Sequence, residues 1–213
     1  MPAPIDFYFD FLSPFGYLAA MKIDDLAARH NRTANWHPFL LGITVVKIMG
    51  LKPLLDTPLK GPYLLRDMPR LAKLLNVPLK LPEGDVMFDS LPAARAFYWM
   101  HDQRPDKAKT FAKRLYMLRF QEIADIADPE RLAVEAQALG FSGNALLDGL
   151  QDPAVKQRVK EAVDEAVGRG VFGSPFFIVD GEPFWGCDRL WMLDHWLAHG
   201  DWVARPGGPL PPV

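Results

Sequence analysis

Residues 5–17 read IDFYFDFLSPFGY, and within this stretch the pattern changes from that of a strand to that of a helix. Apolar side chains at positions 5, 7, 9 and 11 alternate with more polar ones, Asp10 among them, which is the period of a half-buried β-strand. Ser13 and Pro14 are typical of a helix start, because serine accepts an unpaired backbone N–H and proline's fixed φ suits the first turn. We therefore predict a strand that leads into a helix whose first turn can stabilise an anion.

The composition of the 213 residues, 49% hydrophobic and 23% charged, is that of an ordinary globular protein. The net charge of −2 with interspersed signs indicates neither a nucleic acid nor an anionic membrane as a partner. No apolar run approaches the roughly 18 residues that span a bilayer, and the first residues lack a secretory signal. The single cysteine, Cys187, cannot form an intramolecular disulfide, which fits a reducing compartment. We expect a cytoplasmic protein.

Further along the chain, the first half is predicted to hold one more strand and several helices. A helix over 15–30 and a strand over 33–40, parallel to the first, would form a βαβ unit. Residues 41–62 are dense in Gly and Pro, which predicts a long irregular connection with short helical pieces. Helical patterns without a strand pattern occupy 63–150, and Ser90 is the expected N-cap of one of these helices.

Strand patterns return only after a clear helix over 153–168, for which Asp152 is the expected N-cap. Two apolar runs in FFIVDGEPFWG flank Asp180 and Gly181, a strong hairpin signal. Asp188 is the expected N-cap of a last helix. The resulting order, β-α-β, a helical block and α-β-β-α, is that of an α/β thioredoxin-like fold interrupted by a large all-helical insertion.

This order predicts three parts of the chain. Residues 1–42 and 151–200 together form a discontinuous thioredoxin-like domain. Residues 43–150 form a helical insertion domain, and 201–213 form an irregular C-terminal tail.

Two long segments carry a resemblance to a known family: DFYFDFLSPFGYLA (6–19) and VFGSPFFIVDGEPFWGCDRLWMLDHW (171–196). Together with FLLG (39–42) and KGPYLLRDMPRLAKLLNVPL (60–79), they resemble the 2-hydroxychromene-2-carboxylate isomerases. That family belongs with the kappa-class glutathione transferases and shares its fold with DsbA-like oxidoreductases. The resemblance implies glutathione as cofactor, a small aromatic substrate and a homodimer.

The resemblance makes Ser13 the catalytic residue, which hydrogen-bonds the glutathione sulfur in place of a redox cysteine. Ser13-Pro14-Phe15-Gly16 stands where an oxidoreductase has Cys-x-x-Cys, so disulfide exchange is excluded here. A hydroxyl donor and helix N–H groups would favour the thiolate. The alternative is that Ser13 is only an N-cap.

Further glutathione contacts follow from the resemblance. Pro175 matches a cis-proline position, and the Ser174 backbone would pair with the cysteinyl main chain, although Pro175 could simply open a strand. Asp188 would contact the γ-glutamyl end, unless it only caps the last helix, and Arg189 would lie beside it or pair with a carboxylate. Lys60 would reach a glutathione carboxylate, or else remain a solvated loop lysine.

The chain departs from the family pattern in three places, one of which is the segment ITVVKIMG (43–50), whose length and content differ from the usual loop. Cys187 lies within the γ-glutamyl segment where relatives have Asn or Ser, and Leu51 stands where kappa-class relatives have Asn. Lys47 is a candidate for the substrate carboxylate. The wall against a flat aromatic substrate is expected from four residues: Phe15, Tyr63, Phe88 and Trp99.

The predicted function is a glutathione-dependent isomerase that converts 2-hydroxychromene-2-carboxylate, or a similar intermediate of aromatic catabolism, to trans-o-hydroxybenzylidenepyruvate. In this family the thiolate adds reversibly, a double bond becomes a rotatable single bond, and glutathione is regenerated. One alternative is a kappa-like transferase that conjugates glutathione to electrophiles. Another is a non-catalytic thioredoxin-fold binding protein. His195 and His199 lack a third ligand, so no metal site is expected.

Overall fold

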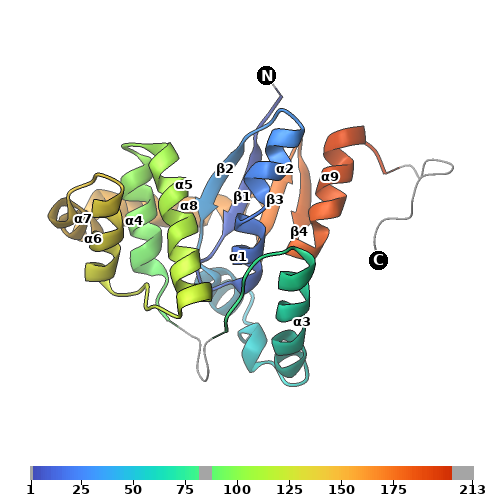
Figure 1. The fold of residues 1–213 in the computed structure, drawn as a ribbon, viewed down its shortest axis with the longest axis horizontal. Helices are drawn as coiled ribbons and strands as arrows, with labels where there is room; N and C mark the ends of the chain where they lie inside the picture. The colour runs from blue at the N-terminus through green and yellow to red at the C-terminus, as the bar shows by residue number, and fades with distance from the viewer. Residues whose placement is uncertain (1, 82–87, 203–213) are drawn as a thin grey trace.

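A computed structural model describes residues 2–81 and 88–202, and its centre is a mixed four-stranded sheet with the order β2-β1-β3-β4 (Figure 1). β1 (Ile5–Phe9) pairs in parallel with β2 (Ala34–Pro38), as predicted. β3 (Phe176–Val179) pairs antiparallel with β1 and with β4 (Glu182–Trp185). The α/β thioredoxin-like fold predicted from the element order is confirmed.

The β3–β4 hairpin and most helix starts follow the local sequence signals. Asp180 and Gly181 both have positive φ, 53° and 84°, as a two-residue type I′ turn requires. The Ser13 side chain caps α1, and the Asp152 side chain caps α8 (Pro153–Gly168). The helix predicted over 15–30 is instead two helices, α1 (Pro14–Ala20) and α2 (Ile23–Arg29).

One predicted cap position is confirmed and another is wrong. Ser90 is the N-cap residue of α4 (Leu91–His101), as predicted, although its side chain does not bond to the first turn. The Leu91 N–H at the start of this helix instead donates to Asp89 Oδ1 (2.9 Å). Asp188 does not cap the last helix, because it lies in the 3₁₀ turn η4 (Cys187–Arg189) and α9 (Leu190–His199) has Arg189 at its N-cap position.

The remaining helices divide into two groups in space (Figure 1). One group lies to one side of the sheet and comprises α4 (Leu91–His101), α5 (Pro105–Met117), α6 (Pro129–Ala138) and α7 (Gly143–Gln151). The helix α3 (Lys60–Leu74) lies apart from that group and contacts α1. The described part of 43–150 contains helices and turns but no strand, as predicted. The domain boundaries stay a prediction, and the predicted tail is outside the described residues from 203 onward.

Both faces of the sheet are buried. Phe7, Phe9 and Phe177 pack with residues of α1, α4 and α5 on one face. Tyr8, on the opposite face, packs with Val163 and other residues of α8, so the polar face predicted for β1 is covered by a helix. Local alternation separates the two faces of a strand, but it does not reveal that a distant helix covers the second one.

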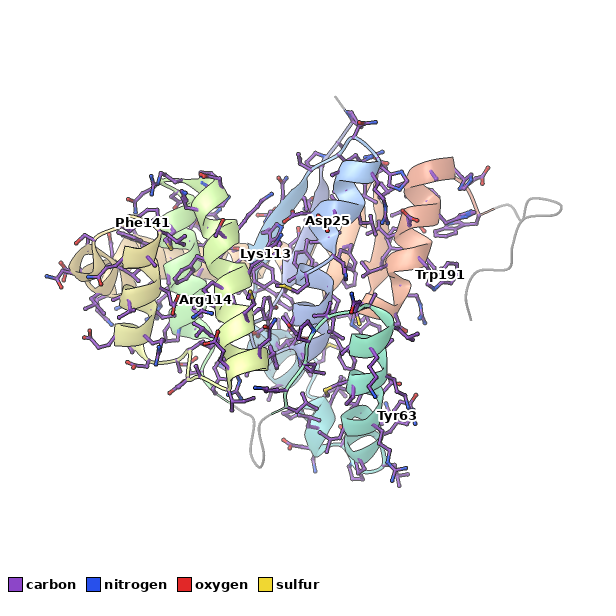
Figure 2. The ribbon with its side chains drawn as sticks, viewed as in Figure 1. Asp25, Tyr63, Lys113, Arg114, Phe141 and Trp191 are labelled. Carbon is purple, nitrogen blue, oxygen red and sulfur yellow. The ribbon has the colours of Figure 1, made fainter. Side chains whose placement is uncertain are left out.

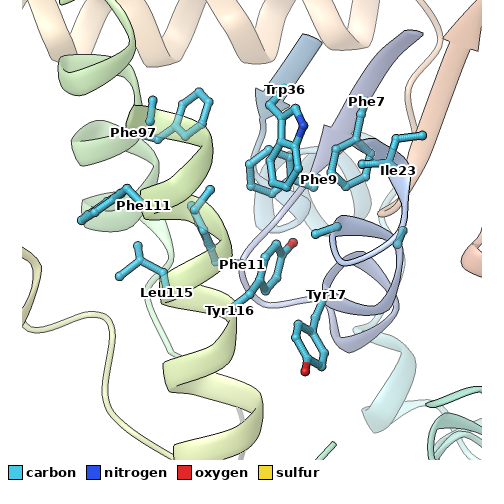
Figure 3. Close-up of a cluster of buried hydrophobic side chains, with 14 of the residues drawn as sticks. Phe7, Phe9, Phe11, Tyr17, Ile23, Trp36, Phe97, Phe111, Leu115 and Tyr116 are labelled. Atoms are coloured by element: carbon cyan, nitrogen blue, oxygen red, sulfur yellow. The ribbon is translucent and has the colours of Figure 1, made fainter. Parts of the chain in front are cut away.

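Aromatic side chains dominate the first of these two faces (Figure 3). Phe7 packs edge-on against Trp36 with the ring centroids 5.0 Å apart, and Phe9 packs edge-on against Phe97 of α4 at 5.9 Å. Tyr116 of α5 points toward α1, where it packs beside Phe11. These contacts fix α4 and α5 against the end of β1, which is where the chain turns into α1.

Candidate active site

A cleft of about 700 Å³ opens at this end of the sheet. Its floor is the turn from β1 into α1. Its sides are the π-helical segment η1 (Gly42–Ile48), the 3₁₀ turn η2 (Leu54–Asp56), α3, and the segments 172–174 and 185–189. These last two segments flank the β3–β4 hairpin on the side away from its turn. The fold therefore brings six separate parts of the chain to one opening, and the volume is typical of a small-molecule site.

Most of the residues predicted for glutathione and one predicted for the substrate line this cleft: Ser13, Phe15, Lys60, Ser174, Cys187, Asp188 and Arg189. Pro175 lies directly beside them, and the Ser174–Pro175 peptide bond is cis. The Gly186 N–H donates to the Pro175 carbonyl (3.0 Å), which ties the segment containing Asp188 to the one containing Ser174.

Four other predicted substrate residues do not line the cleft. Lys47 is exposed on η1, and Tyr63 lies on the outer side of α3, 56% exposed (Figure 2). Phe88 packs under the guanidinium of Arg119, 4.6 Å from its ring centroid. Trp99 packs against Phe141 and against Gly149, whose missing side chain makes room for its indole. The expected aromatic wall from the helical block is therefore absent from the cleft lining, because α4 turns Trp99 toward α7.

Ser13 is almost fully buried, with 5% of its surface exposed, at the floor of the cleft. Its Oγ accepts the Gly16 N–H at 2.9 Å, the bond of an N-cap. The same hydroxyl donates to the Ser174 carbonyl oxygen, also at 2.9 Å. Ser13 is therefore both a helix cap and a member of a polar group inside the cleft.

Gly16 occupies the position of the second cysteine in a Cys-x-x-Cys motif, and a side chain there would be crowded by its neighbours. A Cβ added at Gly16 would lie 2.6 Å from Ser174 Oγ and 2.8 Å from Tyr116 Oη. Those hydroxyls hold the polypeptide around the site: Ser174 Oγ accepts the Asp10 N–H (3.0 Å), and Tyr116 donates to the Asp10 carbonyl (2.9 Å). Serine thus stands in place of the first cysteine of the motif, and close packing around Gly16 leaves little room for the side chain of a second.

Asp10 is the site residue that the sequence prediction missed. Its side chain is fully buried and accepts the Leu12 N–H (2.9 Å), the Leu41 N–H (2.7 Å) and a hydrogen bond from Ser90. Burial raises the pKa of this carboxyl, and the three hydrogen bonds oppose that rise. The alternation of β1 assigned Asp10 to an exposed face. Its place between the strand and Ser13 was the only sequence signal of its role.

The charged groups of the cleft are divided between paired and unpaired ones. Lys60 and Lys52, which both line it, make no ion pair with any residue of the described ranges. Asp188 and Arg189 pair with each other at 2.5 Å. Burial, with a smaller contribution from Asp188, raises the pKa of the Cys187 thiol to about 12, so this thiol stays protonated and is no nucleophile.

The uncharged walls of the cleft are of two kinds. Aliphatic side chains of η1, η2 and α3 line one side. Phe172 and Trp185 line another, packed edge to face with their centroids 4.9 Å apart, and Trp185 is 50% exposed. The cleft combines a hydroxyl and free ammonium groups with apolar walls, which suits an anionic thiol and an apolar second molecule.

Residues 4–198 match the family model of the DsbA-like thioredoxin domain, and the chain belongs to that family. It is 32% identical over 198 residues to the 2-hydroxychromene-2-carboxylate isomerase of Sphingobium xenophagum, covering 92% of this chain and 99% of the relative. Glutathione S-transferase kappa 1 of Homo sapiens is 28% identical over 100% of this chain and 96% of the relative. A solved 2-hydroxychromene-2-carboxylate isomerase superposes with a TM-score of 0.80 at 29% identity, over 91% of this chain and 94% of that one. The resemblance seen in the sequence is confirmed.

Among the described residues, no helix has the length and apolar character to cross a membrane. No group of three or more His, Cys, Asp or Glu side chains in that same part of the chain is placed to hold a metal ion.

Proposed function

We propose that the chain is a glutathione-dependent isomerase that converts 2-hydroxychromene-2-carboxylate, or a similar aromatic-catabolism intermediate, to trans-o-hydroxybenzylidenepyruvate. The observation that carries the proposal is the buried Ser13 hydroxyl at the floor of a cleft that also holds Lys60, which forms no ion pair among the described residues. Support also comes from relatives of about 30% identity that are 2-hydroxychromene-2-carboxylate isomerases.

The residues of the cleft fit glutathione, which carries two carboxylates, one ammonium and a thiol at neutral pH. Lys60 is proposed to hold one carboxylate. Asp188, with Arg189 beside it, is proposed to hold the γ-glutamyl end, next to the buried Cys187. Ser174 has an N–H that bonds to no described residue, and it is proposed to pair with the cysteinyl main chain.

Bound glutathione supplies a nucleophilic thiolate that adds reversibly to a conjugated double bond. The Ser13 hydroxyl and the N–H groups at the start of α1 are proposed to stabilise that anion. Phe15 is the predicted wall residue that lines the cleft, and we propose that it contacts the aromatic substrate together with Phe172 and Trp185. Lys47, Tyr63, Phe88 and Trp99 receive no role in this proposal, because they lie outside the cleft lining.

The experiment that tests the proposal compares glutathione binding by the native protein and by Ser13→Ala, using calorimetry and the ultraviolet absorbance of the thiolate. Ser142→Ala is a matched control, since Ser142 also caps a helix, α7, through the Ala145 N–H. We expect the native protein and the control to bind glutathione as the thiolate, and Ser13→Ala to lose the thiolate signal. Absence of glutathione binding by the native protein at millimolar concentration would reject the proposal and favour a non-catalytic binding protein.

The kappa-class relatives favour a second candidate, a transferase that conjugates glutathione to electrophiles. Both candidates use the same thiolate and differ in what leaves the site. Chromatography of the products of 2-hydroxychromene-2-carboxylate separates them: an isomerase returns free glutathione and the ring-opened ketoacid, whereas a transferase releases a stable adduct.

We further propose that the protein is a cytoplasmic homodimer. Exposed leucines on and before α3, Leu59, Leu65 and Leu74, support a contact with a second copy. Light scattering would measure twice the monomer mass if the homodimer forms, and the monomer mass otherwise.

A further inference from the structure

The Ser13 hydroxyl carries a single proton, and in the structure that proton is directed to the Ser174 carbonyl oxygen at 2.9 Å. The oxygen also accepts the Gly16 N–H, a bond that requires no proton from serine. With 5% of its surface exposed, Ser13 has little access to water as another acceptor. The hydroxyl therefore cannot donate to a sulfur atom unless it first leaves Ser174.

Leaving Ser174 has a cost. Ser174 is 9% exposed, and Ser13 supplies the hydrogen bond that its carbonyl oxygen receives from within the described residues. The neighbouring Gly186 N–H is not available as a substitute, because it donates to the Pro175 carbonyl. A buried carbonyl that loses its partner is unfavourable by an amount that corresponds to about tenfold or more in an equilibrium. A ligand that only accepted the Ser13 proton would incur this penalty.

Ser174 also has a free donor. Its own N–H bonds to no residue in the described ranges, and the segment lies at the start of β3 on the lining of the cleft. One residue thus presents an unpaired N–H and a carbonyl whose partner can be exchanged. A peptide group of a ligand matches this pair, as one strand matches the edge of another.

We infer that Ser13 and Ser174 form an exchange pair: the N–H of an acylated cysteine in the ligand bonds the Ser174 carbonyl and thereby frees the Ser13 hydroxyl for the ligand's sulfur. The inference rests on the proposed function, since glutathione is the thiol concerned, and it adds a specificity determinant. The site activates thiols that carry a peptide N–H next to the sulfur-bearing side chain. Thiols without that N–H can enter the cleft but leave the Ser13 proton on Ser174.

The test uses glutathione and an ester analogue in which the cysteinyl N–H is replaced by oxygen, with no added bulk. The pKa of each bound thiol is measured at saturation from the ultraviolet absorbance of the thiolate as a function of pH, in the native protein and in Ser13→Ala. Glutathione methylated at the glycyl nitrogen, the other peptide group, serves as the control ligand.

In the native protein we expect the bound thiol pKa of the ester analogue to lie about one unit or more above that of glutathione. The control ligand should match glutathione. In Ser13→Ala the difference between ester and glutathione should vanish, because no hydroxyl remains to be freed. An equal difference in both proteins, or none in either, overturns the inference while leaving the proposed function intact. A glutathione thiol that is not ionised in the native protein rejects the proposed function itself.

A crystal structure of the glutathione complex decides the matter even if the ester analogue binds too weakly to titrate. The inference requires the cysteinyl nitrogen within hydrogen-bond distance of the Ser174 carbonyl, and Ser13 Oγ near the sulfur and more than 3.5 Å from that carbonyl. Retention of the 2.9 Å bond between Ser13 and Ser174 beside bound glutathione overturns it.

Discussion

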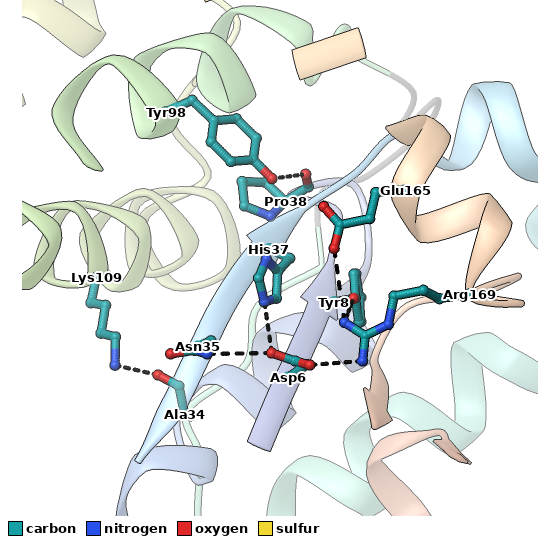
Figure 4. A network of polar contacts seen from close by, with 10 residues as sticks. All are labelled: Asp6, Tyr8, Ala34, Asn35, His37, Pro38, Tyr98, Lys109, Glu165 and Arg169. Carbon is teal, nitrogen blue, oxygen red and sulfur yellow. Dashed lines mark hydrogen bonds and ion pairs between the residues drawn. The ribbon is translucent and has the colours of Figure 1, made fainter. Parts of the chain in front are cut away.

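One aspartate, Asp6, lies near the start of strand β1, and another, Asp10, directly follows its end. The two carboxylates have different kinds of partners. Asp6 forms an ion pair with Arg169 (2.8 Å), which directly follows α8, and a hydrogen bond with the His37 ring (3.0 Å), as Figure 4 shows. Asp10 has no cation beside it in the described part of the chain and is held by Leu12, Leu41 and Ser90.

The pKa values of the two carboxyls move in opposite directions. For Asp6, burial acts to raise the pKa, but the hydrogen bonds and charges of His37 and Arg169 outweigh it and lower the pKa to about 2. For Asp10, burial is the larger effect and the pKa is raised. The ion pair of Asp6 with Arg169 therefore holds the end of α8 against the sheet. The Asp10 carboxyl, which accepts hydrogen bonds from Leu12, Leu41 and Ser90, instead positions segments that build the cleft.

Asp10→Asn tests the cleft half of this comparison and should have the largest effect. An asparagine keeps the shape but turns one acceptor oxygen into an NH₂ group, which then faces the Leu12 or the Leu41 N–H. A buried backbone donor without a partner, together with the lost charge-assisted bond, should reduce the free energy of unfolding by about 3 kcal/mol. Urea denaturation measures this loss.

The same variant should also weaken glutathione binding, because Asp10 contacts Ser13 and Ser174 through its main chain. Asp148→Asn provides a control carboxylate on α7, away from the cleft. A variant Asp10→Asn that is as stable as the native protein would show that the three donors find other partners, and the comparison of the two aspartates would fail.

Asp6→Asn tests the other end of the strand through its pH dependence. The folded pKa of about 2 lies below the unfolded value of 3.8, so the ionised carboxylate stabilises the folded state by about 2 kcal/mol at neutral pH. This contribution is fully present above pH 4 and is lost as the pH falls toward 2. The native protein should therefore exceed Asp6→Asn in stability at pH 7 and lose that advantage by pH 2, as measured by urea unfolding at each pH.

For Asp10 we expect the opposite dependence of stability on pH. Because its folded pKa is raised, the folded state holds that proton more tightly than the unfolded chain, and the native protein loses stability as the pH rises above 3.8. This loss should be missing from Asp10→Asn. A parallel pH dependence in the two variants would show that the carboxyls do not differ in the way their surroundings indicate.

Gly16→Ala tests the packing at the cleft end of β1, and we expect a smaller loss of stability than for Asp10→Asn. The new Cβ would approach Ser174 Oγ and Tyr116 Oη below 3 Å, and such overpacking costs about 2 kcal/mol. Removing a helical glycine returns about 1 kcal/mol, so calorimetric unfolding should show a net loss of about 1 kcal/mol. Gly168→Ala, at the end of α8 with nothing within 4 Å of its added Cβ, should show no loss. Equal stability of both variants would mean that Ser174 and Tyr116 yield freely.

The parts that the sequence predicted well are those determined by neighbouring residues. The bounds of α8, the turn at Asp180 and Gly181, and the cap at Ser13 depend on caps and turn residues within a few positions. The resemblance of whole segments then predicted one shared site for Lys60, Ser174 and Asp188, which lie far apart in the sequence. All three line the cleft.

What the sequence could not predict depends on which distant element packs where. The burial of Asp10 requires Leu41 and Ser90, from two other parts of the chain, to meet at the end of β1. The large aromatic side chain of Trp99 could form a cleft wall, but the missing side chain of Gly149 lets it pack against α7 instead. Such contacts are long-range, and no local pattern specifies them.

The last prediction concerns two lysines that the sequence places five residues apart and the structure treats differently. Lys52 lines the cleft without an ion pair among the described residues, while Lys47, the candidate chosen from the sequence, is exposed outside the lining. If Lys52 holds the carboxylate of the second substrate, Lys52→Met removes a charge-assisted hydrogen bond worth about 1.5 kcal/mol. The KM for 2-hydroxychromene-2-carboxylate should then rise about tenfold at nearly unchanged stability. Lys47→Met should leave KM within twofold. The reverse result would restore Lys47 as the substrate's partner, and a loss of glutathione affinity in Lys52→Met would instead assign Lys52 to a glutathione carboxylate.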